Sequence, residues 1–578
     1  MKRRRLSAVS LVTALLAGGL LLAAACTRMP AAPPAPPQIA PHFVATGFLG
    51  AVATADERAS AAGLRMLEAG GNAVDAFAAA SFAVSVTRPQ STGIGGGGFA
   101  VLYLQPPGRA AKRLAVDFRE RAPIAAFRDM CAGPEQPEDA CRFGPLSVAT
   151  PGLVAGVLAI HANYGRLSRE QVLAPAIELA EMGFPVYDNL AKSIEQAGAL
   201  LARYPESARI FLPDGAAPKP GDVLQQTDLA QTLRGIARDG GRAFYRGRVA
   251  AAIASEMKSL GGLITEKDLS DYRVIDRAAL SGTYRGVEVI TMPPPSSGVL
   301  LLEMMNMLSL AGPVATMEPS ADRYHLLAEV MRRAYEDRAK YLGDPDFYTV
   351  PVRDLTSPAY AAQRFADYDP ARATSRPDVP AAEIKPTTTT HMSIIDAEGN
   401  AVAATETINY TFGSGITVPG TGILLNNEMD DFAARPGVPN LYGLVGSDAN
   451  AIAPRKTPLS SMSPTILVRD GQPILLAGSP GGSLIITATL QTILNAVDLR
   501  MPLPQAVAQP RIHHQAVPNA LVYEPGAMTP AIAAELQRRG HTLKEIPAMG
   551  NVQAVSQSPQ GEKIGVSDPR AEGRPAAY

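Results

Sequence analysis

Tryptophan is absent from this chain of 578 residues, and cysteine occurs only three times, at Cys26, Cys131 and Cys141. So few thiols exclude a thiolate metal site. The only histidine pair, His513-His514, has no third ligand at a recognisable spacing, so we expect no metal and no cofactor. The chain also lacks an excess of one charge sign, with 53 Lys and Arg against 54 Asp and Glu. That balance is unlike the basic footprint of a nucleic-acid binder and favours a small-molecule substrate.

Two widespread motifs are missing as well. No G-x-S-x-G nucleophile elbow occurs anywhere in the chain. The glycine run GIGGGG, residues 93–98, leads into an apolar strand pattern, and no G-K-[ST] follows it. A phosphate-binding loop needs that continuation and a helix after it, so the run is better explained by close backbone packing.

The N-terminus has the pattern of an export signal. MKRRR is basic, the residues after it are apolar, and AAA precedes Cys26. Residues 1–26 are therefore predicted to be an export signal, and LLAAAC is similar to a lipobox in which Cys26 is cleaved and acylated. Two alternatives stay open, a periplasmic or secreted protein without an anchor and a lipoprotein held to the membrane through Cys26. The Pro-rich residues 27–41 are predicted to form an extended linker.

Export bears on the other two cysteines, which lie in CAGPEQPEDAC. In an oxidising compartment, a surface-loop disulfide between Cys131 and Cys141 is predicted. The alternative is two reduced thiols on a variable loop.

The periodicity of the chain changes near residue 389. Before it, helices are predicted within 54–87, at 168–183 with an S-x-x-Q capping box, and at 321–345, where Tyr324, Leu327, Met331 and Ala334 share one face. Residues 347–388 are rich in Pro and Asp and show little periodicity. After Thr389 short apolar strands dominate, followed by helices at about 484–498 and 529–540. The join between the two parts is polar.

That join contains four consecutive threonines followed by a hairpin pattern. In MSIIDAEGNAVAATETI, a loop Ala397-Glu398-Gly399 with glycine at the positive-φ position places Thr389 directly opposite Thr407. If the bond between Thr388 and Thr389 were cut, Thr389 would carry a free α-amine, whose reference pKa of about 7.7–8.0 suits a base near neutral pH. One residue would then supply both nucleophile and base. The alternative is an ordinary edge strand, in which β-branched residues are favoured.

Several motifs resemble the γ-glutamyltranspeptidase family, especially its bacterial members. They are EAGGNAVDA, GIGGGGF, DFRE, TTHMSIIDAEGNAVAATETINYTFGSGI, GTGILLNNEMDDFAARPGVPNLYGL, PLSSMSPTILV, GSPGGS and GVSDPR. The resemblance covers roughly residues 42–578. It implies an α/β (α+β) fold of the N-terminal nucleophile hydrolase type, a four-layer αββα sandwich made as one precursor. Autocleavage would give a helix-rich large subunit, 42–388, and a strand-rich catalytic small subunit, 389–578.

The same resemblance implies a role for each matching residue. Thr389 would be the nucleophile, oriented by Thr407, and the N–H groups of Gly481 and Gly482 would hold the oxyanion. Thr390 could be mistaken for the nucleophile, but motif alignment and hairpin register both favour Thr389. The substrate's carboxylate would be bound by Arg119, Ser460 and Ser461. Its ammonium would be bound by Asn409, Glu428 and Asp431.

ARPGVPNLYGL, residues 434–444, matches the lid loop of lid-bearing members, with Tyr442 as its aromatic residue. One departure is Leu484, where bacterial relatives often have Arg. This puts local surface contacts in doubt and leaves the oxyanion donors unaffected.

The resemblance implies a γ-glutamyltransferase and glutathione hydrolase. Glutathione or another γ-glutamyl amide would acylate Thr389, and water, an amino acid or a dipeptide would accept the γ-glutamyl group. Two alternatives remain, an acylase of glutaryl or cephalosporin type from the same family and a non-catalytic surface lipoprotein. The expected partners are small molecules and the two subunits of one precursor, with no nucleic acid.

Overall fold

The computed structural model describes residues 39–132, 139–374, 388–435, 437–440 and 442–578. The predicted export signal, the acylation of Cys26 and most of the predicted linker lie outside these residues. Within them, no helix has the length and apolar character needed to cross a membrane.

Two seven-stranded antiparallel sheets form the centre of the fold. One, the catalytic sheet, has the order β21-β2-β10-β11-β3-β4-β7. Its strands, in that order, are Ala576–Ala577, Ala51–Thr54, Thr390–Ile395, Ala401–Thr407, Gly97–Leu104, Lys112–Phe118 and Ile275–Ala278. The other, the opposing sheet, has the order β1-β20-β19-β15-β14-β9-β8. Its strands are Val44–Gly47, Lys563–Ser567, Gln553–Gln557, Gln472–Gly478, Thr465–Arg469, Val287–Thr291 and Leu280–Tyr284.

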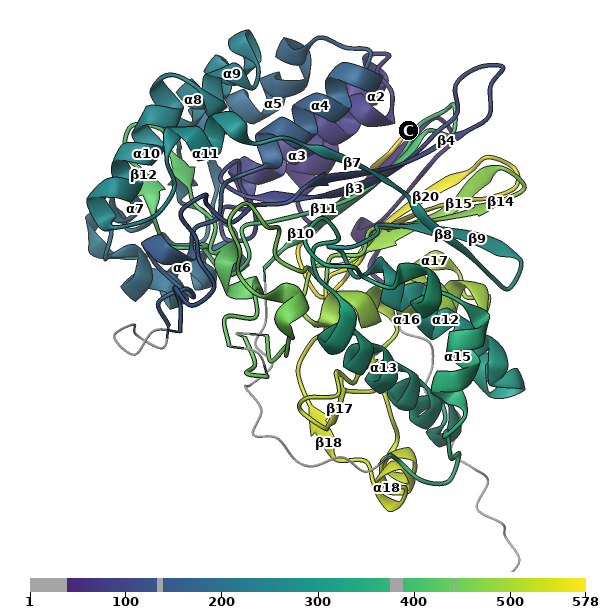
Figure 1. The fold of residues 1–578 in the computed structure, drawn as a ribbon. Coiled ribbons are helices and arrows are strands. Elements are labelled where there is room, and N and C mark those ends of the chain that lie inside the picture. Colours follow the sequence, from purple (N-terminus) through teal and green to yellow (C-terminus); the bar gives the residue numbers. More distant parts are fainter. Residues whose placement is uncertain (1–38, 133–138, 375–387, 436, 441) are drawn as a thin grey trace, which may run out of the picture. The chain divides into compact units, whose positions relative to one another are not determined.

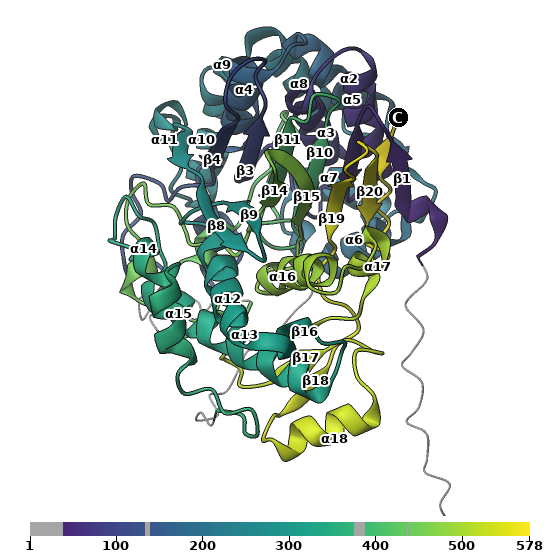
Figure 2. The ribbon, with the colours of Figure 1, turned by 90° about the vertical axis from the view of Figure 1, so that its right-hand side faces the viewer.

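Helices cover the outer face of each sheet (Figures 1 and 2). Over the catalytic sheet lie α2 (Glu57–Glu68), α3 (Ala73–Thr87), α4 (Leu153–Tyr164), α5 (Arg169–Met182), α8 (Thr227–Asp239) and α10 (Arg248–Leu260), with the shorter α9 (Arg242–Tyr245) and α11 (Glu266–Asp271) beside them. The helices α6 (Asp188–Leu201) and α7 (Pro205–Phe211) extend this group. Against the opposing sheet lie α12 (Gly298–Leu310), α16 (Leu484–Val497) and α17 (Leu503–Ala508), and α13 (Ala321–Tyr341) and α15 (Pro358–Phe365) pack on α12.

Three hydrophobic clusters fill the spaces between these layers and pack them together. The first packs α2–α5, α8 and α10 on the catalytic sheet, and the second packs α12, α13 and α16 on the opposing sheet. The third lies between the sheets and joins residues such as Val101 and Ala403 of one to Ile466 and Leu476 of the other. Each sheet is therefore buried on both faces, and the predicted αββα sandwich is confirmed.

Local sequence signals explain where several elements begin. The Asp56 carboxylate accepts the N–H groups of Arg58 and Ala59 and so caps α2. Ser168 and Gln171 form the predicted capping box of α5. The predicted hairpin is confirmed too. Gly399 has φ +80°, and Thr390 pairs with Glu406, which fixes the register that sets Thr389 opposite Thr407.

The long helix predicted from residue 321 is α13; it ends at Tyr341, just before Gly343 and Pro345, and Leu342 already has extended backbone. Residues 347–388, which show little periodicity in sequence, contain α14 (Val352–Leu355) and α15, and the part from 375 to 387 lies outside the described residues. A proline at the first position starts α15, and its apolar side packs on α12. That side is too short to produce a clear period in the sequence.

Strands from both sides of the Thr388–Thr389 bond alternate within each sheet. In the catalytic sheet, β10 and β11 lie between β2 and β3, and in the opposing sheet β14, β15, β19 and β20 lie between β1 and β9. The remaining strands form three small sheets. The strands are β5 (Phe184–Pro185) with β6 (Val223–Leu224), β12 (Thr417–Val418) with β13 (Ile423–Leu424), and β16 (Ile512–His513) with β17 (Leu521–Tyr523) and β18 (Leu543–Glu545). Helix α18 (Pro530–Arg538) lies near the last of these sheets.

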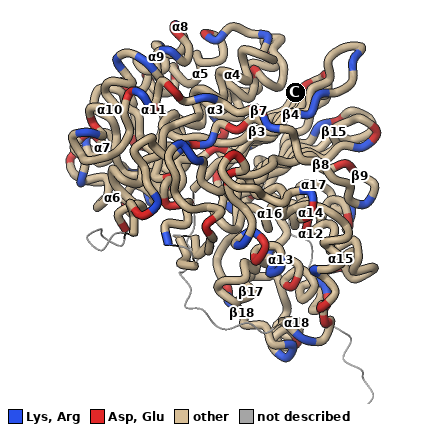
Figure 3. Tube along the Cα trace, in the orientation of Figure 1, with Lys and Arg blue, Asp and Glu red and all other residues tan. Residues whose placement is uncertain are grey.

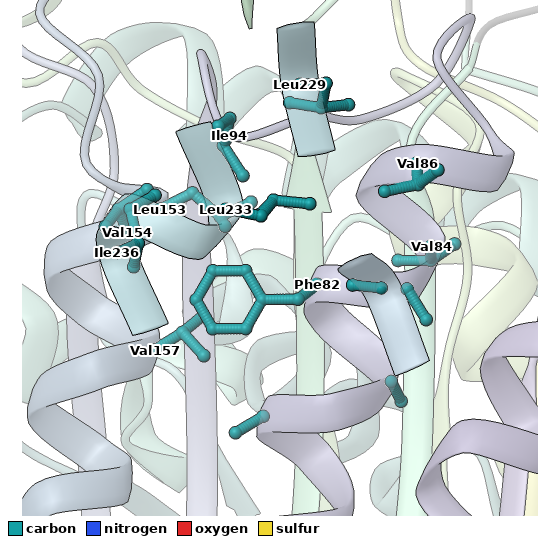
Figure 4. Close-up of a cluster of buried hydrophobic side chains, with 14 of the residues drawn as sticks. Phe82, Val84, Val86, Ile94, Leu153, Val154, Val157, Leu229, Leu233 and Ile236 are labelled. Atoms are coloured by element: carbon teal, nitrogen blue, oxygen red, sulfur yellow. The ribbon is translucent and has the colours of Figure 1, made fainter. Parts of the chain in front are cut away.

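Helix α3 is buried on all sides, and Phe82 projects from it into the helical layer near Val157, Leu233 and Ile236 (Figure 4). Phe82→Ala is expected to lower the free energy of unfolding by about 3–5 kcal/mol, because the removed ring leaves a cavity that close packing cannot fill. Denaturant unfolding measures this, with Phe48→Ala as the control. Phe48 is 61% exposed, so its truncation should change stability by less than about 0.5 kcal/mol. Equal losses in the two variants would contradict the packing argument.

Candidate active site

The two threonines brought together by the hairpin register lie at its open end. Thr389 directly precedes β10, and its Oγ1 lies 3.2 Å from Oγ1 of Thr407 at the end of β11. Both side chains are buried. Thr407 Oγ1 also accepts the N–H of Asn409 at 2.8 Å, so its hydroxyl is held in one position. The Thr407 hydroxyl, held by the Asn409 N–H, therefore fixes the position of the Thr389 oxygen.

His391, two residues further on, is a structural neighbour of this pair. Its ring is hydrogen-bonded to Thr405 and Ser393, and burial lowers its pKa to about 3. A neutral ring therefore fills the space between the sheets, against Gly478, where any Cβ would lie 2.3 Å from the ring. This packing holds β10 against β15 of the opposing sheet.

Gly481 and Gly482 form the turn between β15 and α16. Their φ angles of +136° and +55° lie in the region that favours glycine. Neither N–H has an acceptor within the described part of the chain, whereas the carbonyls of both glycines accept N–H groups from the first turn of α16. Gly482 lines the same small cavity as Thr389 and Thr407. The turn thus leaves two N–H donors free, and that of Gly482 belongs to a residue that lines the cavity with the threonine pair; a buried free donor suits a developing oxyanion.

A buried charged cluster forms the other wall of this cavity. Nη1 of Arg119 lies 2.5 Å from Oε1 of Glu428, and Nη2 lies 2.5 Å from Oδ2 of Asp431. Burial acts to lower the pKa of Arg119, but the charges of Glu428 and Asp431 outweigh it and raise that pKa. Burial also raises the pKa of both carboxyl groups, against the opposing effect of Arg119. Elsewhere in the fold, positions of both charge signs are interspersed along the chain trace (Figure 3).

Glu120, which the sequence did not mark as a site residue, is fully buried, and its carboxyl lies 3.8 Å from Nη1 of Arg119 and interacts with Glu428. Burial raises its pKa, and neither of its oxygens has a hydrogen-bond donor among the described residues. A proton shared with Glu428 would supply the missing bond. Strand alternation would turn Glu120 away from Arg119, but β4 ends at Phe118 and the alternation no longer applies.

The remaining predicted site residues lie on the same cavity. Ser460, Ser461, Asn409 and Tyr442 all line it. The Tyr442 hydroxyl donates to Oδ1 of Asn409 at 2.5 Å, so the lid residue bonds directly to a predicted ammonium ligand. The structure therefore brings together every residue predicted for the substrate, although these roles remain predictions.

Little free space is left among these residues. The cavity measures about 20 Å³, enough for roughly one water molecule. Arg119 forms ion pairs with both carboxylates, and the Tyr442 hydroxyl bonds to Asn409. Neither oxygen of Glu428 has a hydrogen-bond donor among the described residues. A ligand larger than a water molecule would have to displace Tyr442 and separate these ion pairs.

The Cys131–Cys141 disulfide braces the segment that carries the carboxylates. The two cysteines are bonded, with their Cα atoms 5.6 Å apart, as the sequence predicts for an exported protein. Both pack in one cluster with Met429 and Phe432, which flank Asp431. Next to the disulfide, Arg142 pairs with Asp430 at 3.6 Å, and its carbonyl accepts Nδ2 of Asn427.

Replacing both cysteines by serine is expected to lower the free energy of unfolding by about 3 kcal/mol, the value for closing a loop of this length. KM for the substrate is expected to rise, because Met429 and Phe432 lose their support. Denaturant unfolding and steady-state kinetics measure the two effects. Reduction of the parent protein should reproduce both, and an unchanged KM in the double variant would contradict the bracing role.

The structure also shows the surroundings of Leu484 and of the histidine pair, which the sequence analysis discussed. Leu484, the departure from the family pattern, is buried against Val522 and Met549 in a small apolar cluster. Ring nitrogens of His513 bond to Thr487 and Gln515. Within the described ranges, no group of three or more His, Cys, Asp or Glu side chains could hold a metal ion.

Known proteins resemble this chain in both sequence and fold. A family model described as gamma-glutamyltranspeptidase matches residues 59–578. The chain is 43% identical to a glutathione hydrolase proenzyme of Escherichia coli strain K12, over 95% of this chain and 96% of the relative. It is 38% identical to the acylase ACY 1 proenzyme of Pseudomonas sp. strain V22, over 92% and 94%. The crystal structure of a cephalosporin acylase from Bacillus halodurans superposes with a TM-score of 0.82 at 30% identity, covering 96% of this chain and 99% of that chain.

Proposed function

This chain belongs to the γ-glutamyltranspeptidase family, and from that premise we propose that it cleaves its own Thr388–Thr389 bond and then acts as a γ-glutamyltransferase and glutathione hydrolase. The donor is glutathione or another γ-glutamyl amide. The acceptor is water, an amino acid or a dipeptide. Thr389 carries the γ-glutamyl group between them as an ester.

The observation that carries this proposal is the charge pattern around the cavity. A γ-glutamyl group ends in a carboxylate and an ammonium, and the cluster offers Arg119 to the first and Glu428 with Asp431 to the second. Binding would exchange each internal ion pair for one with the substrate, so no buried charge is left without a partner. A glutaryl group brings only the carboxylate and would leave Glu428 and Asp431 uncompensated.

The same residues account for the maturation step. In the intact chain, Oγ1 of Thr389 attacks the carbonyl carbon of Thr388, and the peptide nitrogen leaves as the α-amine of Thr389. Water then hydrolyses the resulting ester, which gives a carboxylate on Thr388 and restores the Thr389 hydroxyl. Thr407 holds the attacking oxygen through the 3.2 Å contact. Because strands from both products alternate in each sheet, the two subunits would stay together after cleavage.

Turnover then follows from the freed α-amine. It takes the hydroxyl proton of Thr389 as Oγ1 attacks the γ-amide carbon of the substrate, and the N–H groups of Gly481 and Gly482 hold the oxyanion. The α-ammonium returns the proton to the leaving amine, so the γ-glutamyl ester forms as the amide bond breaks. Water or an acceptor amine repeats the sequence in reverse, with the α-amine again taking the proton. Tyr442 and the lid would limit water access to this ester.

The acylase is the second candidate, because an acylase proenzyme and a cephalosporin acylase are among the similar proteins. Turnover of γ-glutamyl-p-nitroanilide and glutaryl-p-nitroanilide by the purified protein separates the two. We expect a preference for the γ-glutamyl substrate, and a preference for the glutaryl substrate would favour the acylase. Two bands on a denaturing gel support the autocleaving enzyme, whereas one full-length band with no turnover would favour the non-catalytic lipoprotein.

Export to the periplasm or medium, with or without a lipid at Cys26, is part of the same proposal. It is supported by the signal-like sequence of residues 1–26 and by the disulfide, which forms in oxidising compartments. Mass spectrometry of the mature N-terminus tests it. A lipid-modified Cys26 would support the anchor, an unmodified new N-terminus would support secretion, and an intact Met1 would contradict both.

A further inference from the structure

Arg338 is a second buried cation beside the pocket, and the predicted site does not include it. It lies in the last turn of α13 and is 5% exposed. Its Nε donates to Oγ of Ser297 at 3.3 Å, and its Nη2 donates to Oγ of Ser461 at 3.2 Å. Within the residues that the structure describes, Arg338 has no carboxylate partner at ion-pair distance, although Asp431 and Arg119 are near enough for their charges to act on it.

A buried cation without an anion is costly, since a guanidinium loses its hydration and gains no counter-charge. The negative end of the α13 dipole offsets part of that cost. The cluster's own anions are already used, because Glu428 and Asp431 pair with Arg119. The missing negative charge beside Arg338 is therefore one that a ligand could bring.

The hydrogen bonds of the two serines indicate where that charge would lie. Ser461 Oγ accepts from Arg338, and Ser460 Oγ accepts the N–H of Met462 at 3.1 Å. Each hydroxyl then keeps its own hydrogen, and neither donates to an acceptor in the described part of the chain. Both serines line the cavity. Two free O–H donors at this wall are suited to a carboxylate.

Arg338 also fixes the backbone that carries these donors. Ser297 Oγ accepts from Arg338 and donates to the carbonyl of Ser460 at 2.6 Å. The guanidinium thus bonds to the Ser461 side chain directly and to the Ser460 backbone through Ser297. It touches the serines and does not line the cavity itself.

We propose that Arg338 is a positioning residue for the donor substrate's α-carboxylate, setting the Ser460 and Ser461 hydroxyls as donors and supplying positive charge behind them. This rests on the proposed function, in which the donor is a γ-glutamyl amide. Arg338 would thereby select donors that carry an α-carboxylate over otherwise identical donors that lack it.

The test compares γ-glutamyl-p-nitroanilide with 4-aminobutanoyl-p-nitroanilide, which differs only by lacking the α-carboxylate. Arg338→Met is expected to lower kcat/KM for the γ-glutamyl substrate about 10- to 100-fold, mainly through KM, because bonds to a charged ligand are lost. For the second substrate, kcat/KM should change less than about 3-fold. The ratio of the two values is a readout that a purely structural role would not move.

Arg323→Met is the matched control. Arg323 lies on the same helix, is 3% exposed, and donates to a carbonyl oxygen, that of Met317, without a carboxylate partner at ion-pair distance among the described residues. Its replacement should leave the substrate ratio unchanged. Arg338→Lys keeps the positive charge and loses the forked pair of guanidinium N–H donors. Its ratio of kcat/KM for the two substrates should lie between those of the parent and of Arg338→Met.

If Arg338→Met does not yield the two subunits, Arg338→Lys decides by the same ratio. If the measured variant loses activity equally on both substrates, the ratio of their kcat/KM values is unchanged, and this would overturn the role of Arg338. Failure of the parent protein to turn over γ-glutamyl-p-nitroanilide would instead overturn the proposed function, so the two failures can be told apart.

Discussion

Thr389→Ala is expected to give a single full-length chain with turnover of γ-glutamyl-p-nitroanilide reduced by about 10⁴-fold or more. The change removes the oxygen that lies 3.2 Å from Thr407. Without it, no ester can form with Thr388 or with a substrate, so maturation and turnover fail together. A denaturing gel shows the first effect and a p-nitroaniline assay shows the second.

Thr390→Ala is the matched control, since it makes the same change one residue further along β10. Thr390 pairs across the hairpin with Glu406, and its side chain lies on the opposite face of the strand from Thr389. Its Oγ1 has no hydrogen-bond partner among the described residues. This variant should still split into two subunits and keep activity within about 10-fold of the parent. Splitting and turnover in Thr389→Ala, with both absent in Thr390→Ala, would reverse the assignment.

The parts of this site that sequence could predict depend on short-range geometry. The hairpin needs only a two-residue alternation and a glycine that adopts positive φ, and Gly399 supplies it at φ +80°. The facing of Thr389 and Thr407 follows directly. The helix starts at Asp56 and Ser168 are equally local, because a capping side chain bonds to N–H groups two or three residues away.

The charged wall of the pocket could not be derived in this way. Arg119 and Asp431 are 312 residues apart in the chain, and no periodicity links them. Only the resemblance to the family placed them in one site. The order of the sheets was equally out of reach, because β10 pairs with β2 through contacts that span more than 300 residues.

Arg338 is a case where a local signal was available. The face of α13 that carries Tyr324, Leu327, Met331 and Ala334 continues four residues later at Arg338. A charged residue on an otherwise apolar stripe is unusual unless it has a buried partner. The pattern marks the residue, but the polar group it faces, Ser461, comes from a distant part of the chain.

Asp431→Asn is expected to reverse the choice between γ-glutamyl and glutaryl donors. The change removes one of the two carboxylates available to the substrate ammonium and keeps the size of the side chain. Turnover of γ-glutamyl-p-nitroanilide should fall about 100- to 1000-fold, the usual cost of removing one member of a buried charged pair. Turnover of glutaryl-p-nitroanilide should rise relative to it, because a glutaryl group no longer leaves Asp431 buried without a counter-charge.

Asp430→Asn provides the control for that reversal. Asp430 is also buried, and it pairs with Arg142 at 3.6 Å on the side of the turn that faces the disulfide. It does not line the cavity with Thr389. Its loss should weaken the turn without changing the ratio of kcat/KM for the two donors. If both variants shift the ratio equally, selectivity depends on the shape of the turn. If only Asp431→Asn shifts it, selectivity depends on the single charge that faces the substrate ammonium.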